Sequence, residues 1–91
     1  NLNLLLNPNL KMHYVYILRS IRFPDQIYVG YTTNLESRLS KHNSGQSEHT
    51  SRYLPWEIIW YGAFPEKLKA LAFENYLKSH SGNAFASIRL M

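Results

Sequence analysis

The chain has no cysteine and only four glycines and four prolines among its 91 residues. Without cysteine there is no disulfide framework, no thiolate metal site and no cysteine nucleophile, so packing alone must stabilise the fold. That composition fits the reducing cytoplasm, where we expect the protein to be located. No apolar run approaches the length of about 20 residues that crosses a bilayer, so we expect no membrane partner.

Acidic residues are also scarce, with six Asp and Glu against ten Lys and Arg. A basic chain with seven tyrosines favours an anionic partner such as nucleic acid, through phosphate neutralisation and base stacking. The length allows one small domain. We expect residues 1–11 to be a leader, disordered or added to the natural chain, and residues 12–91 to form that single domain, with Met12 as the natural start.

Three short runs have the composition of β-strands. YVYILRS (14–20) and QIYVGYT (26–32) are rich in β-branched and aromatic residues, and the turn signal Pro24-Asp25 between them predicts an antiparallel hairpin. WEIIWYGAF (56–64) is predicted as a third strand, with Glu57 outward or at an edge. The polar segment before it, 46–55, reads as a surface loop.

Helix signals separate and follow these strands. Asn34 is the expected N-cap of a first helix that stops at Gly45, and Pro65 is the expected first residue of a second helix that stops at Ser81-Gly82. A short last helix is predicted after Asn83. The order β-β-α-β-α-α predicts an α+β fold, in which two to three helices flank a small, mainly antiparallel sheet of three strands.

Two polar residues of the first helix draw attention. Leu35 and Leu39 form an apolar stripe, and Arg38 and His42 lie one turn apart beside it, so both are expected to point toward the rim of the sheet. The alternative is structural. Arg38 then covers the edge of the core with its apolar stem, and His42 is a basic residue favoured near a helix C-terminus.

The second helix and the polar loop at 46–55 also allow both a structural and a functional interpretation. Glu74 and Lys78 form an i,i+4 pair that is typical of a solvated helix face, although apolar neighbours would also allow Glu74 to border a cleft. His49, Thr50 and Arg52 belong to a loop that is either simply polar or lies on phosphates.

In combination, these features resemble the GIY-YIG nuclease domain, in particular its small stand-alone members related to excision-repair (UvrC-type) nucleases. The resemblance covers residues 13–90, although the first motif opens with a tyrosine where the family carries glycine. The residues that carry it are Tyr14-Val15-Tyr16, Tyr28-Val29-Gly30, Arg38, His42 and Glu74.

The resemblance implies a metal-dependent DNA endonuclease or DNA-repair domain that hydrolyses phosphodiester bonds. Because we expect no second DNA-binding domain, we expect either low intrinsic specificity or a protein partner that supplies it. In the family a tyrosine is proposed as general base, which makes Tyr16 or Tyr28 the candidate, and Arg38 would stabilise the charged transition state, with His42 beside it. Glu74 would hold Mg²⁺ or Mn²⁺. The further residues expected to contact DNA are Lys41, His49, Thr50, Arg52 and Lys78.

Strand alternation narrows the choice among the tyrosines. It puts Tyr14 and Tyr16 on one face of their strand and Tyr28 and Tyr31 on opposite faces of theirs. We therefore predict that Tyr16 and Tyr28 face the site and that the other two pack or contact substrate. A phenol has a pKa near 10, so a tyrosine base needs positive charge nearby.

Two other classes of function remain open. One is a nucleic-acid-binding module that keeps the fold but cleaves weakly or not at all, and the other is a structural or protein-interaction domain. The presence of a complete set of polar site residues argues against both, because a retired site is expected to lose some of them.

Overall fold

The computed structural model describes residues 11–79. The elements are, in chain order, β1 (His13–Ser20), β2 (Ile27–Thr32), α2 (Leu35–Asn43), the short 3-10 helix η1 (Ser51–Tyr53), β3 (Trp56–Phe64) and α3 (Lys67–Lys78). The predicted α+β fold and its three strands are thus confirmed. The predicted last helix lies outside the described residues, as does nearly all of the predicted leader.

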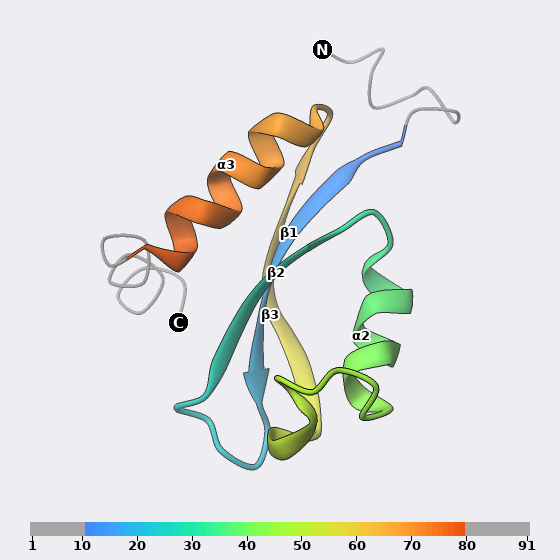
Figure 1. Cartoon of the computed structure of the whole chain (residues 1–91), viewed down its shortest axis with the longest axis vertical. Coiled ribbons are helices and arrows are strands. Elements are labelled where there is room, and N and C mark those ends of the chain that lie inside the picture. Colours follow the sequence, from blue (N-terminus) through green and yellow to red (C-terminus); the bar gives the residue numbers. More distant parts are fainter. Residues whose placement is uncertain (1–10, 80–91) are drawn as a thin grey trace.

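The three strands form one antiparallel sheet in the order β2-β1-β3, so β1 is central and both of its neighbours are edges (Figure 1). The predicted hairpin of β1 and β2 is therefore correct. Its register places Tyr16 directly opposite Gly30. Cross-strand partners share a face of the sheet, so any side chain of residue 30 would lie beside that of Tyr16.

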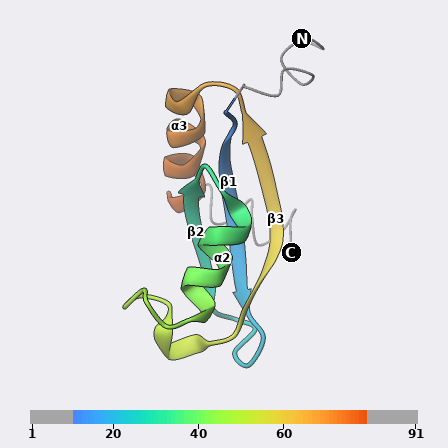
Figure 2. The same ribbon diagram turned by 90° about the vertical axis from the view of Figure 1, so that its right-hand side faces the viewer.

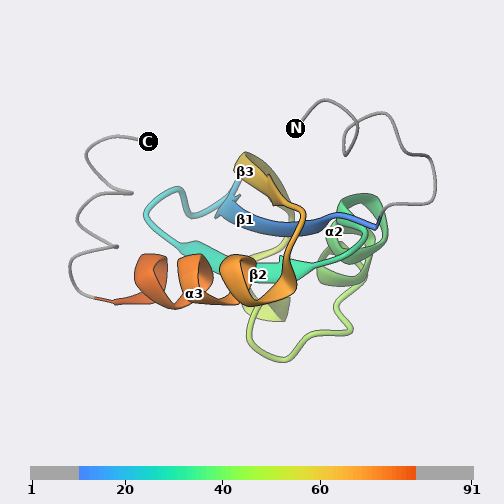
Figure 3. The same ribbon diagram turned by 90° about the horizontal axis from the view of Figure 1, so that it is seen from above.

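Each face of the sheet carries one helix. α2 lies in front of one face in Figure 2, and α3 runs alongside β2 on the other side, as the view from above in Figure 3 shows. The core between the sheet and α3 contains Val15, Ile17, Val29, Ala70 and Leu77. The core on the α2 side is built on Tyr16, Leu18 and Trp56.

The helix ends follow local chemistry, with one correction. The side chain of Asn34 accepts a hydrogen bond from Ser37 N at 3.0 Å, as expected of an N-cap. The prediction that Pro65 is the first helical residue is wrong, because α3 begins at Lys67 and the intervening Glu66 keeps an extended backbone as the N-cap. α3 ends at Lys78, before the predicted stop signal, which lies outside the described residues.

The end of α2 is tied to the start of β3. Asn43 Nδ2 donates to the carbonyl oxygen of Trp56 at 3.0 Å, and Asn43 Oδ1 accepts from the backbone N–H of Trp56. The Trp56 indole in turn donates to the carbonyl oxygen of Thr50 at 2.8 Å. These bonds fix α2 and the loop after it over the sheet.

Candidate active site

Tyr16 occupies the centre of the candidate site. It comes from the central strand, and its ring crosses β2 at Gly30, where an added Cβ would lie 2.4 Å from Tyr16 Oη. Real Cβ atoms do not approach other atoms so closely. Gly30 therefore leaves the space in which the phenol hydroxyl lies.

A buried hydrogen-bond chain holds this hydroxyl. Tyr16 Oη lies 3.0 Å from His42 Nε2, and His42 Nδ1 lies 2.8 Å from Thr50 Oγ1. His42 is only 2% exposed and Thr50 has no exposed surface. His42 does lie in the last turn of α2, as the structural alternative expected, but its ring is also buried and contacts the phenol.

The second phenol of the expected pair lies beside the first. The ring centroid of Tyr28 is 6.4 Å from that of Tyr16 and 5.0 Å from that of His42. Tyr31 instead packs with the α3-side core and hydrogen-bonds His13. Tyr28 and Tyr31 therefore lie on opposite faces of the sheet, as strand alternation predicted.

Glu74 reaches the same region from α3. Its side chain is 15% exposed, and its Oε2 lies 3.2 Å from Lys78 Nζ. Lys78 Nζ in turn lies 6.0 Å from the ring centroid of Tyr28. The reading of this helix stripe as a fully solvated face fails for Glu74, since most of its side chain is enclosed next to the tyrosines.

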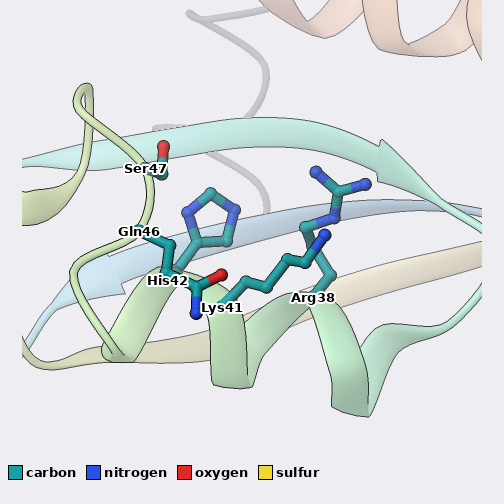
Figure 4. Close-up of a pocket in the computed structure, with 5 residues that line it drawn as sticks. All are labelled: Arg38, Lys41, His42, Gln46 and Ser47. Atoms are coloured by element: carbon teal, nitrogen blue, oxygen red, sulfur yellow. The ribbon is translucent and has the colours of Figure 1, made fainter.

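A basic pocket opens beside His42. It has a volume of about 220 Å³ and is lined by Arg38, Lys41, His42, Gln46 and Ser47. Figure 4 shows Arg38 and His42 pointing from α2 toward the sheet, with Lys41 extending along the helix toward Arg38. No acidic side chain lines this pocket, and neither Arg38 nor Lys41 forms a salt bridge within residues 11–79.

Burial, followed by the neighbouring charges, sets the protonation states of Tyr16 and His42. Burial raises the pKa of Tyr16, and neighbouring Tyr28 and Glu74 raise it further, while Arg38 lowers it. Burial, followed by the charge of Arg38, lowers the pKa of His42. Near neutral pH Tyr16 is therefore a neutral phenol and His42 a neutral imidazole, and further positive charge would be needed to form the phenolate.

The donor set suits a weakly held, hydrated divalent cation. No group of three or more His, Cys, Asp or Glu side chains gathers within residues 11–79, so a site coordinated mainly by protein is absent there. Mg²⁺ keeps several waters and is commonly bound by one or two carboxylates together with substrate phosphates. Glu74 is a carboxylate of this kind, largely enclosed beside the phenols.

The other residues expected to contact nucleic acid lie in different places. Lys41 lines the basic pocket, whereas His49 and Arg52 line a separate surface pocket of about 400 Å³. Thr50 does not fit that expectation, because it is fully buried and contacts His42 instead. Its link to His42 was missed, since nothing in the sequence connects a loop hydroxyl to a helix residue eight positions earlier.

The GIY-YIG catalytic domain family matches residues 12–86 of the chain. The chain belongs to the GIY-YIG family. This family of nuclease domains generally uses a divalent metal and acts on DNA. The match spans the sheet and both helices, and it therefore covers all the residues described above.

Several GIY-YIG relatives are similar over most of their length. A UPF0213 protein of Streptococcus pyogenes serotype M3 is 36% identical over 69 residues, which are 75% of this chain and 73% of the relative. The solution structure of a UPF0213 protein from Bacillus halodurans superposes with a TM-score of 0.51 at 32% identity, covering 87% of this chain and 86% of that one.

A larger relative carries a functional name. The chain is 37% identical over 65 residues to a structure-specific endonuclease subunit SLX1 homolog of Giardia intestinalis. That alignment covers 67% of this chain and only 18% of the relative, so the two share this domain alone. Within residues 11–79, no helix is long and apolar enough to span a membrane.

Proposed function

We propose that this GIY-YIG protein is a divalent-metal-dependent endonuclease that hydrolyses phosphodiester bonds in DNA. The observation that carries the proposal is the convergence of four side chains, from β2, α2 and α3, around one hydroxyl of β1, that of Tyr16. Tyr28, Arg38, His42 and Glu74 all contact it, pack beside its ring or influence its pKa. A purely structural domain gains little from burying Tyr16 and His42 beside these ionisable groups, because burying polar groups is costly.

In the proposed reaction, the Tyr16 phenol first gives its own proton to solvent, and the resulting phenolate is the general base that takes a proton from the attacking water. The buried environment that raises its pKa also makes its phenolate a strong base once formed. His42, 3.0 Å from the hydroxyl, orients the phenol. Arg38 stabilises the negative charge that develops on the phosphoryl oxygens, since its planar guanidinium matches two of them.

Glu74 is the residue that would hold Mg²⁺ or Mn²⁺. Such an ion supplies Lewis-acid stabilisation of the phosphoryl group and of the departing 3′ oxygen. Beside Glu74, Lys78 faces the Tyr28 ring and brings a positive charge toward the phenols. Lys41, next to Arg38 in a pocket without acidic groups, is placed to bind a neighbouring phosphate of the strand.

The name of the Giardia relative suggests which DNA to test. Its name describes an endonuclease that is specific for DNA structure, so flapped and forked duplexes should be tested beside plain duplex and single strands. So small a domain has little surface for reading base sequence, and we propose that a protein partner supplies further selectivity.

The decisive experiment is a cleavage assay on these four DNA forms, with Mg²⁺, with Mn²⁺ and with chelator. We expect metal-dependent cleavage that is lost in Glu74→Ala and Arg38→Ala. Glu66→Ala and Arg22→Ala are the matched controls, because each removes the same charge at an exposed position away from the site. Equal loss in the controls would indicate a general charge effect and would contradict the assignment.

Binding without cleavage would favour the second candidate, a nucleic-acid-binding module. Two independent measurements separate the cases. Mn²⁺ should broaden the NMR signals of residues around Glu74 in the wild type but not in Glu74→Gln, whatever the cleavage assay shows. A protein that binds DNA but shows neither broadening nor cleavage would be a binding module.

A further inference from the structure

The chain of hydrogen bonds from Tyr16 through His42 to Thr50 has one hydrogen too many. Each hydroxyl carries one hydrogen and a neutral imidazole carries one, which makes three donors. Only two contacts, of 3.0 and 2.8 Å, are available to them. One hydroxyl hydrogen must therefore point out of the chain, either at the Tyr16 end or at the Thr50 end.

The two ends differ in what they offer this hydrogen. Thr50 has no exposed surface, and within residues 11–79 its hydroxyl has no hydrogen-bond partner other than His42. The carbonyl of Thr50 is already bonded by the indole of Trp56. A hydrogen pointing away from His42 at this end would thus be buried without an acceptor, which native structures avoid.

The Tyr16 end is also buried, with 2% of the residue exposed, but it offers this hydrogen an acceptor. The hydroxyl lies over Gly30 and next to His42, which lines the pocket with Arg38, and the carboxylate of Glu74 is close enough to influence its pKa. The carboxylate, or an oxygen of a molecule bound in that pocket, can accept a hydrogen there. The free hydrogen therefore belongs to Tyr16, and Thr50 must direct its own toward the imidazole.

We propose that Thr50 is a positioning residue whose hydroxyl donates to His42 Nδ1, so that His42 is held as the Nε2–H tautomer and donates to Tyr16 Oη. This role differs from the DNA contact that the sequence analysis expected of Thr50, because the threonine acts through His42. In this arrangement the phenol hydrogen faces the substrate side. When Tyr16 loses that hydrogen, the Nε2–H of His42 is already aimed at the oxygen and stabilises the phenolate.

The opposite tautomer would have the opposite effect. His42 would accept the phenol hydrogen, and Tyr16 would present to substrate a hydroxyl whose proton points inward. The hydrogen-bond assignment itself depends only on the folded protein. Its catalytic consequence rests on the proposed nuclease function, so the test has separate readouts for the two.

The first readout is the tautomer of His42 in the wild-type protein. A long-range proton–nitrogen NMR spectrum distinguishes a protonated from an unprotonated ring nitrogen, and His42→Gln identifies the signals of this histidine. We expect Nε2 protonated and Nδ1 unprotonated at neutral pH. A protonated Nδ1 would overturn the proposal directly.

The second readout compares Thr50→Val, which keeps the shape of the side chain but has no hydroxyl, with Thr50→Ser, which retains the hydroxyl. Thr33→Val is the control for the same change away from the site. We expect Thr50→Ser to preserve the tautomer and the cleavage rate. Thr50→Val should give NMR signals of both His42 tautomers and reduce kcat by about 10- to 100-fold, the range found when the hydrogen-bond partner that orients a metal-binding histidine is removed.

The outcomes are distinguishable. A Thr50→Val protein that keeps the wild-type tautomer would refute the role of the threonine. If Thr50→Val does not fold, the His42 tautomer in the wild type and the tautomer and cleavage rate of Thr50→Ser still test the proposal. If the wild type shows the Nε2–H tautomer but cleaves no DNA, the hydrogen-bond assignment stands and the nuclease proposal fails.

Discussion

Adding one methyl group at Gly30 should disable the site without replacing any ionisable residue. In Gly30→Ala, the new Cβ would lie 2.4 Å from Tyr16 Oη and 2.5 Å from its Cζ. Carbon atoms pack at about 3.5–4.0 Å, so the end of the Tyr16 ring must move by about 1 Å. That movement pulls the hydroxyl away from His42, now 3.0 Å distant.

Two magnitudes follow from this displacement. A misplacement of about 1 Å at a reacting group costs about 100-fold in rate, so cleavage should fall by about that factor. In an extended strand alanine is more favourable than glycine by roughly 0.5–1 kcal/mol, which stabilises the variant. Overpacking against Tyr16 destabilises it by about 1–3 kcal/mol. We therefore expect a net destabilisation of about 1–2 kcal/mol, which lowers the Tm of a domain of this size by about 4–16 °C.

A double-mutant cycle provides the control. The side chain in Tyr16→Leu ends before the position of Cζ, so Gly30→Ala should cost no stability in that background. Chemical denaturation of the four proteins measures the coupling. Equal destabilisation by Gly30→Ala in both backgrounds, or unchanged cleavage in the single variant, would refute the idea that Gly30 exists to accommodate the phenol.

Three further predictions test other contacts. The lowered pKa of His42 means that the unfolded chain takes up a proton first, so the free energy of unfolding should decrease as the pH falls from about 7 to about 5, by at most about 1.4 kcal/mol per pH unit. Chemical denaturation of His42→Gln should show a free energy of unfolding without this pH-dependent decrease. An identical slope of free energy against pH in both proteins would contradict the prediction. Asn43→Ala should lower stability by about 1–3 kcal/mol, because it removes both bonds to the Trp56 backbone, and an unchanged denaturation midpoint would argue against that link. Lys41→Ala should reduce the slope of log affinity against log salt for duplex DNA by about 0.9, while Lys69→Ala, which lies on α3 paired with Glu66, should leave it unchanged.

The sequence predicted the elements well because their signals are local. Strand composition, the turn between β1 and β2 and the capping side chain of Asn34 each depend on a few consecutive residues. The error at Pro65 has the same origin. Proline is compatible with the first helical turn, but the sequence alone does not show that the chain stays extended through Glu66.

The candidate site could be predicted less well from such local signals. Helical periodicity alone left Arg38 and Glu74 as surface residues, and only the resemblance to the GIY-YIG family moved them into a site. What enclosed Glu74 is the packing of α3 alongside β2, and what buried His42 is a loop that closes over it through Thr50. Both depend on contacts between segments far apart in the chain, which no local pattern encodes.

One such contact has a consequence for how the protein is made. A ribosome releases the chain from the N-terminus, so Tyr16, Arg38 and His42 emerge well before Trp56, whose backbone anchors the end of α2 through Asn43. Until β3 is out, the bonds that fix the end of α2 over the sheet cannot form, and the Glu74 carboxylate on α3 has yet to appear. A half-made copy that ends before β3 therefore lacks the assembled candidate site, which only the finished sheet brings together.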